Sequence, residues 1–184
     1  VLTQVGYNSG IRSPMDIGDA AIVIGDGLVG QWAAQTLAWR GAEVLLVGKH
    51  HERLKHFGNK PFEHVHHLKD DGDWIERANK LFPNKARIAV DTVGSAEVMG
   101  SFFDVLQRYG HAVSAGFYGT ADALALQPLR YGELSIDLVS GLRPNRMVDT
   151  IRLIAGGHLD TLSLITHRFP AKEAAQAWDL IESK

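Results

Sequence analysis

The chain has 184 residues, of which 45% are hydrophobic and 22% charged, with a formal net charge of −2 and a pI near 6.5. This composition indicates one globular domain, with at most a short appendage, and gives no reason to expect nucleic acid or an anionic membrane as partner. Because the chain has no cysteine, it has no disulfide, thiolate zinc site or cysteine nucleophile. The apolar stretches are only of strand length, and residues 1–10 lack the pattern of a secretory signal. No membrane span is therefore expected, and a cytoplasmic location is predicted.

Short apolar runs alternate with helical patterns from residue 20 onward, which is typical of a parallel sheet covered on both faces. Strands are predicted at 20–25, 43–48, 64–68, 87–92, 111–116 and 134–140, with helices at 28–40, 52–57, 73–81, 96–108 and 121–129. Pro83 and Gly110 are expected to end the third and fourth helices. A helix at 144–155, a strand at 162–168 and a last helix from about Pro170 complete the pattern, and residues 1–15 are expected to be a helix end and a linker. The predicted fold class is α/β, a doubly wound parallel sheet of six strands.

A glycine-rich turn, Gly25-Asp26-Gly27-Leu28-Val29-Gly30, follows the first predicted strand. Gly25 permits a tight turn, Gly27 lets the backbone approach a pyrophosphate, and Gly30 lets the next helix pack against the strand. The start of that helix offers unpaired N–H groups and a positive dipole end to phosphates. The motif alone is a weak signal, but the strand before it and the helix after it predict a Rossmann-type dinucleotide site. The alternative is a structural turn that binds no nucleotide.

The second predicted strand ends at Gly48, where NAD-binding domains usually carry an acidic residue that holds the adenosine ribose. Lys49, His50, His51 and Arg53 follow. Loss of a carboxylate and gain of cations favour the 2′-phosphate of NADP over NAD, with Lys49 and Arg53 as main contacts and His50 or His51 as helper. The alternative is that these are solvated charges at a helix start.

Other sites fit the sequence less well. His64 and His66 would share one strand face, but spacing fixes no third ligand beside them, so solvated histidines are expected rather than a metal site. Ser95 is interpreted as a helix N-cap, since the chain has no Gly-x-Ser-x-Gly elbow of a serine hydrolase. The P-loop pattern is absent, and Gly48 counts against a methyltransferase.

An ordered set of short motifs resembles the medium-chain dehydrogenase/reductase superfamily, in its zinc-type alcohol dehydrogenase branch, over nearly all of the chain. The motifs are Gly18-Asp19, the turn at 25–30, Asp91-Thr92-Val93-Gly94, Ala115-Gly116-Phe117 and the late run 164–178. Within this branch, residues 115–118 and 164–175 resemble the hydroxyethyl-bacteriochlorophyllide dehydrogenases. Polyol and sugar dehydrogenases share much of the late segment.

The resemblance implies further contacts with a nicotinamide cofactor. Backbone N–H groups of Leu28 and Val29 would bind the pyrophosphate. The residues that would surround the nicotinamide end are Thr92 and Val93 at its ribose, Ala115, Gly116 and Phe117 at its carboxamide, and Ser140, Gly141 and Leu142 beside the ring. The alternative for Thr92 is a structural hydroxyl at a strand end, and for Phe117 and Tyr118 it is ordinary packing.

The resemblance also implies a GroES-like catalytic domain that precedes the cofactor domain and supplies Cys, His and Glu as zinc ligands. The chain is expected to start after that domain, with a lead-in at 1–19, an NAD(P)-binding Rossmann domain at 20–158, and the start of a C-terminal catalytic-domain segment at 159–184. No catalytic residue is expected within it, and catalytic zinc only through the missing domain.

The predicted function is the cofactor-binding portion of an NAD(P)-dependent alcohol or polyol dehydrogenase that transfers hydride between a secondary alcohol and nicotinamide. A zinc-independent quinone or enoyl reductase and a non-catalytic nucleotide-binding module are the alternatives. The expected partners are a nicotinamide dinucleotide, a small-molecule substrate, and a second copy of the chain through the sixth strand.

Overall fold

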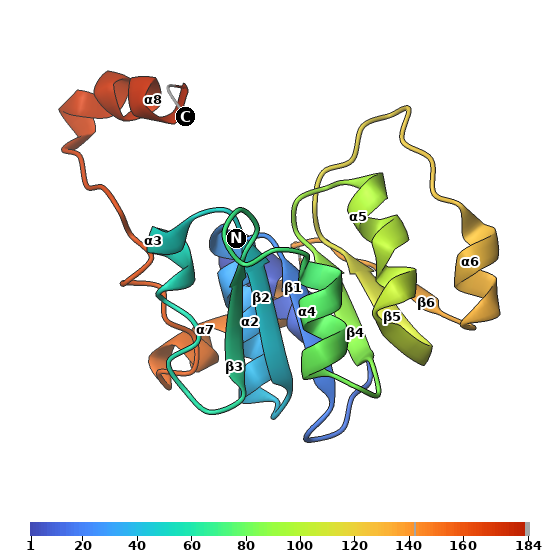
Figure 1. The fold of residues 1–184 in the computed structure, drawn as a ribbon. Coiled ribbons are helices and arrows are strands. Elements are labelled where there is room, and N and C mark those ends of the chain that lie inside the picture. The colour runs from blue at the N-terminus through green and yellow to red at the C-terminus, as the bar shows by residue number, and fades with distance from the viewer. Residues whose placement is uncertain (142, 183–184) are drawn as a thin grey trace.

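The computed structural model describes residues 1–141 and 143–182. It contains a six-stranded parallel sheet in the order β3-β2-β1-β4-β5-β6, with helices on both faces (Figure 1), which confirms the predicted doubly wound α/β fold. The strands are β1 Ala20–Ile24, β2 Glu43–Gly48, β3 Glu63–His67, β4 Ala86–Asp91, β5 Leu106–Ser114 and β6 Ser135–Leu138. The helices are α1 Leu2–Ile11, α2 Leu28–Trp39, α3 His51–Leu54, α4 Trp74–Leu81, α5 Ala96–Ser101, α6 Leu126–Tyr131, α7 Pro144–Ala155 and α8 Ala174–Glu182, with short 3₁₀ turns η1 Phe102–Asp104 and η2 Ala171–Glu173.

The centre of the sheet is apolar on both faces. Val23 of β1 pairs with Leu46 of β2 on one side and Val90 of β4 on the other, and all three are fully buried. One face packs against α2 and α3, and the other packs against α4, α5 and η1. Burial on both faces explains why these strands read as continuous apolar runs rather than as alternating patterns.

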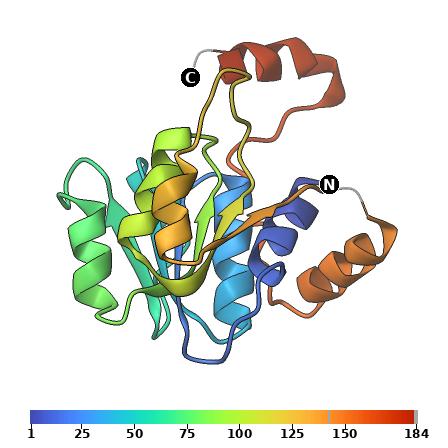
Figure 2. The same cartoon turned by 90° about the vertical axis from the view of Figure 1, so that its right-hand side faces the viewer.

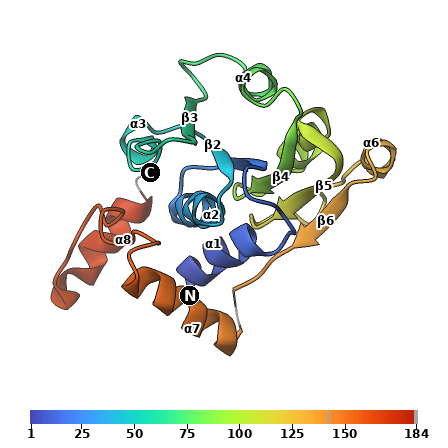
Figure 3. The same cartoon turned by 90° about the horizontal axis from the view of Figure 1, so that it is seen from below.

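The N-terminal segment contains the ten-residue helix α1, and residues 12–19 lead from it into β1. Helix α1 lies between α2 and α7 (Figure 3). Gly6 and Gly10 allow this, because a Cβ at either position would overlap the side chain of Trp32 or Thr36 on α2. Asn8 fastens the other side of the helix, since its side-chain amide donates to the carbonyl of Ser140 at 2.9 Å.

The predicted helix at 96–108 is wrong in its second half. Helix α5 ends at Ser101, whose hydroxyl bonds back to the carbonyl of Val98 at 2.7 Å, and β5 begins at Leu106. Leu106 pairs with Ala86 of β4, so a strand partner overrode the helical spacing of the apolar residues. Gly110 therefore lies inside β5 and does not end a helix. The helix predicted at 121–129 forms later, as α6.

The predicted strand at 162–168 is also wrong. Asp160 accepts the backbone N–H groups of Leu162 and Ser163, both at 3.1 Å, and turns the chain before any strand could begin. Within the described ranges 1–141 and 143–182, this segment has no strand beside it to pair with. The helix predicted from Pro170 does form, as η2 and α8, and it stands outside the body of the domain (Figures 1 and 2).

The sequence suggested that the histidines of β3 are solvated, but two of them are buried. His66 is fully buried and His67 is only 6% exposed. The turn after β3 covers this end of the strand, and its Gly72 carbonyl lies 3.2 Å from His66 Nε2. A backbone partner makes burial of an imidazole acceptable, and the apolar–polar pattern alone did not reveal that partner.

Candidate cofactor-binding site

The glycine-rich turn connects β1 to α2 in a tight backbone arrangement. Gly25 has a φ of 112°, which an L side chain rarely adopts. A Cβ at Gly30 would overlap the carbonyl oxygen of Gly25. The first turn of α2 therefore lies directly against the end of β1, as the sequence motif predicts.

Gly27, the N-cap of α2, has a different environment. A Cβ there would meet no atom within 4 Å, so the space above Gly27 is open. The first N–H groups of a helix have no partner inside it and attract anions. The arrangement suits a phosphate group resting on Gly27 and on the backbone of Leu28 and Val29.

The side chain of Asp26 is a central feature of this site that the sequence analysis missed. It reaches from the turn after β1 to the end of β2, where Oδ2 accepts the backbone N–H of Lys49 at 2.8 Å and of His50 at 2.7 Å. A Cβ at Gly48 would overlap Asp26, so the glycine makes room for this carboxylate. A carboxylate therefore does lie at the end of β2, although it comes from the turn after β1.

Asp26 is only 5% exposed, yet it is ionised at neutral pH. Burial alone would raise the pKa of its carboxyl group, but hydrogen bonds from the side chain and backbone of His50 and from the Lys49 N–H lower the pKa below its ordinary value. His50 Nδ1 lies 3.0 Å from Oδ1, and the guanidinium of Arg53 lies 3.5 Å from the same oxygen. His50 and Arg53, two of the residues predicted to contact a 2′-phosphate, therefore already contact a carboxylate.

A cleft of about 430 Å³ lies over these turns. It is lined by the following predicted residues: Gly25, Gly27, Leu28, Val29, Gly30, Gly48, Lys49, His50, Thr92 and Val93. Asp26, Leu2 of α1 and Leu68 after β3 also line it and were not predicted. A signal for Asp26 did exist, because turns that follow neighbouring parallel strands meet at the same edge of the sheet.

Thr92 follows β4 at the floor of the cleft. Its hydroxyl donates to the carbonyl oxygen of Ile24 at 2.9 Å, which ties β4 to β1 just before the glycine turn. A Cβ at Gly25 would overlap this hydroxyl. The Thr92 hydroxyl therefore has a structural role, which the sequence analysis gave as the alternative to a contact with the nicotinamide ribose. Val93, beside it, is exposed toward the cleft.

The turns after β4 and β5 are joined through Asp91. This buried carboxylate accepts the backbone N–H groups of Val93, Gly94 and Ser95, and the hydroxyl of Tyr118 donates to it. Burial, and then the bond to Asp91, raise the pKa of Tyr118 above its ordinary value. Tyr118 is thus packed, in line with its alternative.

The other residues predicted at the nicotinamide end surround the cleft less closely. Backbone N–H groups of Ala115 and Gly116 donate to the carbonyl of Asp91 at 2.9 and 3.1 Å. Phe117 is 97% exposed, so ordinary packing is wrong for it. Ser140 and Gly141 lie against α1 and are not among the residues that line the cleft, and Leu142 lies outside the described residues.

A doubly wound parallel sheet, a glycine turn that opens the helix after β1, and a cleft over the carboxyl ends of the strands define a Rossmann-type dinucleotide-binding domain. The zinc-binding dehydrogenase family matches residues 29–156, which is more than half of the chain. The chain belongs to this family, as the resemblance to the zinc-type branch of the medium-chain dehydrogenases predicted.

The chain is 35% identical over 92 residues to the 2-desacetyl-2-hydroxyethyl bacteriochlorophyllide A dehydrogenase of Cereibacter sphaeroides. This match covers 50% of the chain but only 29% of the length of that enzyme. The resemblance within the zinc-type branch thus agrees with a curated relative, of which the chain matches less than a third.

Two solved structures share the fold at low sequence identity. A protein described as a zinc-binding dehydrogenase from Sinorhizobium meliloti 1021, bound to NADP, has a TM-score of 0.81 at 19% identity, over 95% of this chain and 53% of its own. A protein described as a short chain alcohol dehydrogenase from Escherichia coli CFT073, complexed with NADH, has a TM-score of 0.83 at 18% identity, over 100% of this chain and 54% of its own. In the part of the chain that the structure describes, no helix has the length and apolar character needed to cross a bilayer.

Proposed function

We propose that this chain is the cofactor-binding part of an NAD(P)-dependent dehydrogenase of the alcohol or polyol type, in which hydride moves between a secondary alcohol and nicotinamide. The observation that carries the proposal is the open space over Gly27 at the start of α2, between the turns that follow β1, β2 and β4. Family membership and the dehydrogenase names of the neighbours support it. In this proposal residues 20–158 are the cofactor domain, with a lead-in at 1–19 and the start of a catalytic segment at 159–184.

The proposed cofactor position follows the cleft from end to end. The pyrophosphate rests on Gly27, Leu28 and Val29, and the adenosine ribose lies beside Asp26 and Gly48. The nicotinamide end extends past Thr92 and Val93 toward the backbone of Ala115, Gly116 and Phe117, with Ser140 and Gly141 on the far side. The nicotinamide, when bound, supplies the hydride chemistry, while this chain binds and orients it.

The sequence favoured NADP over NAD because the second strand lacks a carboxylate, and the side chain of Asp26 removes that premise. An ionised carboxylate beside the ribose accepts hydrogen bonds from its hydroxyl groups and repels a 2′-phosphate. His50 and Arg53 already contact Asp26, which leaves Lys49 as the cation offered to a phosphate. We therefore propose NAD as the better-bound cofactor, and Asp26 as the residue that decides between the two.

No catalytic residue or catalytic zinc ligand is assigned to this chain. A thiolate ligand is excluded because the chain has no cysteine. The proposal places a catalytic zinc, a small-molecule substrate and the proton-transfer chemistry in a separate catalytic domain. It includes a cytoplasmic location and a homodimer through β6, whose Ile136 and Leu138 are exposed at the edge of the sheet.

The experiment is a titration of the chain with NADH and NADPH, followed by the fluorescence of its tryptophans. We expect NADH to bind more tightly, and Asp26→Asn to shift the ratio of the two affinities about tenfold toward NADPH, equivalent to about 1.4 kcal/mol. Gly27→Ala should weaken both cofactors about tenfold or more, because its Cβ fills the space for the pyrophosphate.

Gly100→Ala on α5 is the matched control, since its Cβ also meets open space but lies away from the cleft. An unchanged ratio in Asp26→Asn contradicts the role of Asp26. Absence of binding by either cofactor contradicts the dehydrogenase proposal and favours the alternative of a structural turn that binds no nucleotide. A quinone or enoyl reductase would bind cofactor in the same way, and turnover of a secondary alcohol by the complete enzyme separates it from the proposed class.

A further inference from the structure

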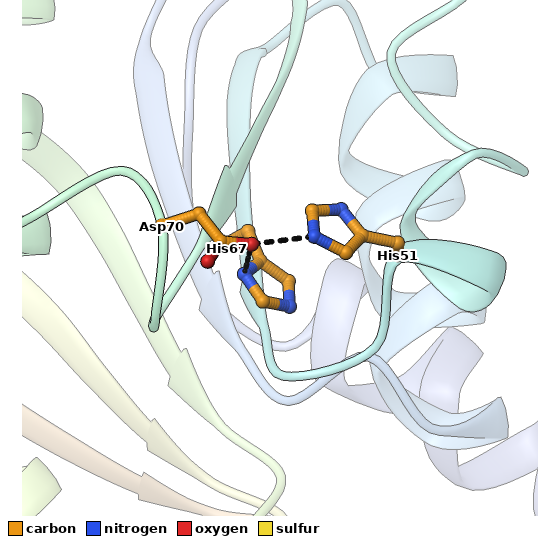
Figure 4. A group of neighbouring side chains, drawn as sticks. All are labelled: His51, His67 and Asp70. Carbon is orange, nitrogen blue, oxygen red and sulfur yellow. Dashed lines mark hydrogen bonds and ion pairs between the residues drawn. The ribbon is translucent and has the colours of Figure 1, made fainter.

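Three side chains from different elements converge at the outer edge of the sheet (Figure 4). They are His51, the first residue of α3, His67, the last residue of β3, and Asp70 in the turn that follows. His51 Nε2 lies 2.6 Å and His67 Nδ1 lies 2.8 Å from the same oxygen, Asp70 Oδ2. The two imidazole rings are stacked with their centroids 3.7 Å apart. One ligand atom from each residue therefore falls within 4.8 Å of the others.

A backbone carbonyl determines which ring nitrogen of His67 carries the hydrogen in the neutral imidazole. His67 Nε2 lies 2.8 Å from the carbonyl oxygen of Lys49, which can only accept, so Nε2 carries the hydrogen. Nδ1 of the neutral ring then presents a lone pair. This atom is buried, and because the Asp70 oxygen beside it is also an acceptor, it has no hydrogen-bond donor among the described residues.

The lone pair of His67 Nδ1 faces a carboxylate. Two electron-rich atoms 2.8 Å apart repel each other unless a cation lies between them. The cluster thus needs either an added proton or a metal ion.

We propose that His51, His67 and Asp70 bind one divalent transition-metal ion of the zinc, cobalt or nickel type. Two imidazoles and one carboxylate are ligands that these ions prefer, and water can complete the coordination. The Nε2–H of His67 donates to a backbone carbonyl, as metal-bound histidines usually do with their second nitrogen. His51 and Asp70 are exposed, which gives an ion access from solvent.

The neighbouring side chains are engaged elsewhere, which sets the cluster apart. Asp71 accepts the backbone N–H of His67 at 2.7 Å and so fixes the turn rather than joining the ligands. His64, on the same strand, pairs with Glu43 at 2.8 Å, and residues 1–141 and 143–182 place no third ligand beside that pair. That pair serves as an internal control.

The test uses the full chain without a histidine tag, titrated with Co²⁺ and followed by visible absorption, and with Zn²⁺ by calorimetry. We expect one equivalent of either ion to bind. His51→Ala and Asp70→Asn should each weaken binding about tenfold or more, while His64→Ala leaves it unchanged. Both weakening substitutions are on exposed side chains, so the fold should survive them, and circular dichroism checks this.

Two results would overturn the proposal. If the wild type and both variants bind equally, the ion lies elsewhere in the chain. If the wild type binds neither Co²⁺ nor Zn²⁺, the cation between His67 and Asp70 is a proton only.

Discussion

The turns after β1, β2 and β3 are joined by side chains that reach from one turn to the next, whereas those after β4 and β5 are joined around Asp91. Asp26 bonds to the backbone of Lys49 and His50, and Lys49 in turn accepts from His67, so three consecutive turns form one polar network. On the other side, the Asp91 carboxylate accepts the hydroxyl of Tyr118, and the Asp91 carbonyl oxygen accepts the N–H groups of Ala115 and Gly116. The comparison teaches that one buried carboxylate organises each set of turns, Asp26 those after β1 and β2 and Asp91 those after β4 and β5.

The largest expected effect is a substitution in the first turn. Gly30→Ala places a Cβ onto the carbonyl oxygen of Gly25 and should lower the free energy of unfolding by about 5 kcal/mol, or abolish cooperative unfolding. Urea denaturation followed by circular dichroism measures it. Gly100→Ala, on α5 in the other half, should instead raise stability by about 0.5–1 kcal/mol, because it favours a helix and meets no atom. If the two substitutions changed the free energy of unfolding equally, the tight packing at Gly30 and the open space at Gly100 would be contradicted.

A large effect is also expected in the core cluster that α5 and η1 form with the sheet. Phe102, the first residue of η1, is fully buried in the cluster that packs on the sheet, and Phe102→Ala should lower the free energy of unfolding by about 3–5 kcal/mol. Met99→Leu, in the same cluster, keeps the volume and should lower it by less than about 1.5 kcal/mol. Denaturation midpoints for the pair test whether this half is close-packed, and a small loss for Phe102→Ala would show that it is loose.

The ionised carboxylate of Asp26 should make the stability of the turns after β1 and β2 sensitive to acid. Asp26→Asn should cost about 2 kcal/mol at neutral pH through weaker hydrogen bonds to the turn after β2. The pKa of Asp26 is lower in the folded than in the unfolded chain, where it is about 4. Its stabilisation is therefore complete above that unfolded value and is lost as the pH falls through the folded pKa. The gap between wild type and variant should narrow below about pH 4, and a constant gap down to pH 2 would contradict the ionised state.

The smallest expected effect is at Phe117. Its side chain is 97% exposed, so Phe117→Ala should change the free energy of unfolding by less than about 0.5 kcal/mol. Since only the backbone at this position is proposed to contact the cofactor, the affinity for NADH should not change either. A loss of affinity would show that the aromatic ring closes over the nicotinamide.

The sequence identified the first half of the fold well because local signals agreed there. The apolar run before Gly25, the helix after Gly27 and the strand ending at Gly48 all have the predicted type and nearly the predicted bounds. In the second half, Leu106 obeys helical spacing from Phe102 but pairs as a strand, and spacing along the chain cannot show that partner. The strand expected at 162–168 does not form, because this apolar segment has no neighbouring strand to pair with among the described residues.

The site shows the same limit. Spacing predicted the glycines of the turn, but Asp26 and the His51–His67–Asp70 cluster depend on contacts between loops that follow neighbouring strands. Treating Gly48 in isolation suggested that the carboxylate was lost. Considering all residues at one sheet edge together would have placed Asp26 beside Gly48.

The reach of Asp26 toward Gly48 has a consequence for redesign of this domain. The two positions share one space, because a Cβ at position 48 would overlap the side chain of Asp26. Gly48→Asp alone should therefore disrupt the turn, whereas the exchange of both residues should restore fold and ribose recognition together. A change of cofactor preference in this chain has to be made at the pair.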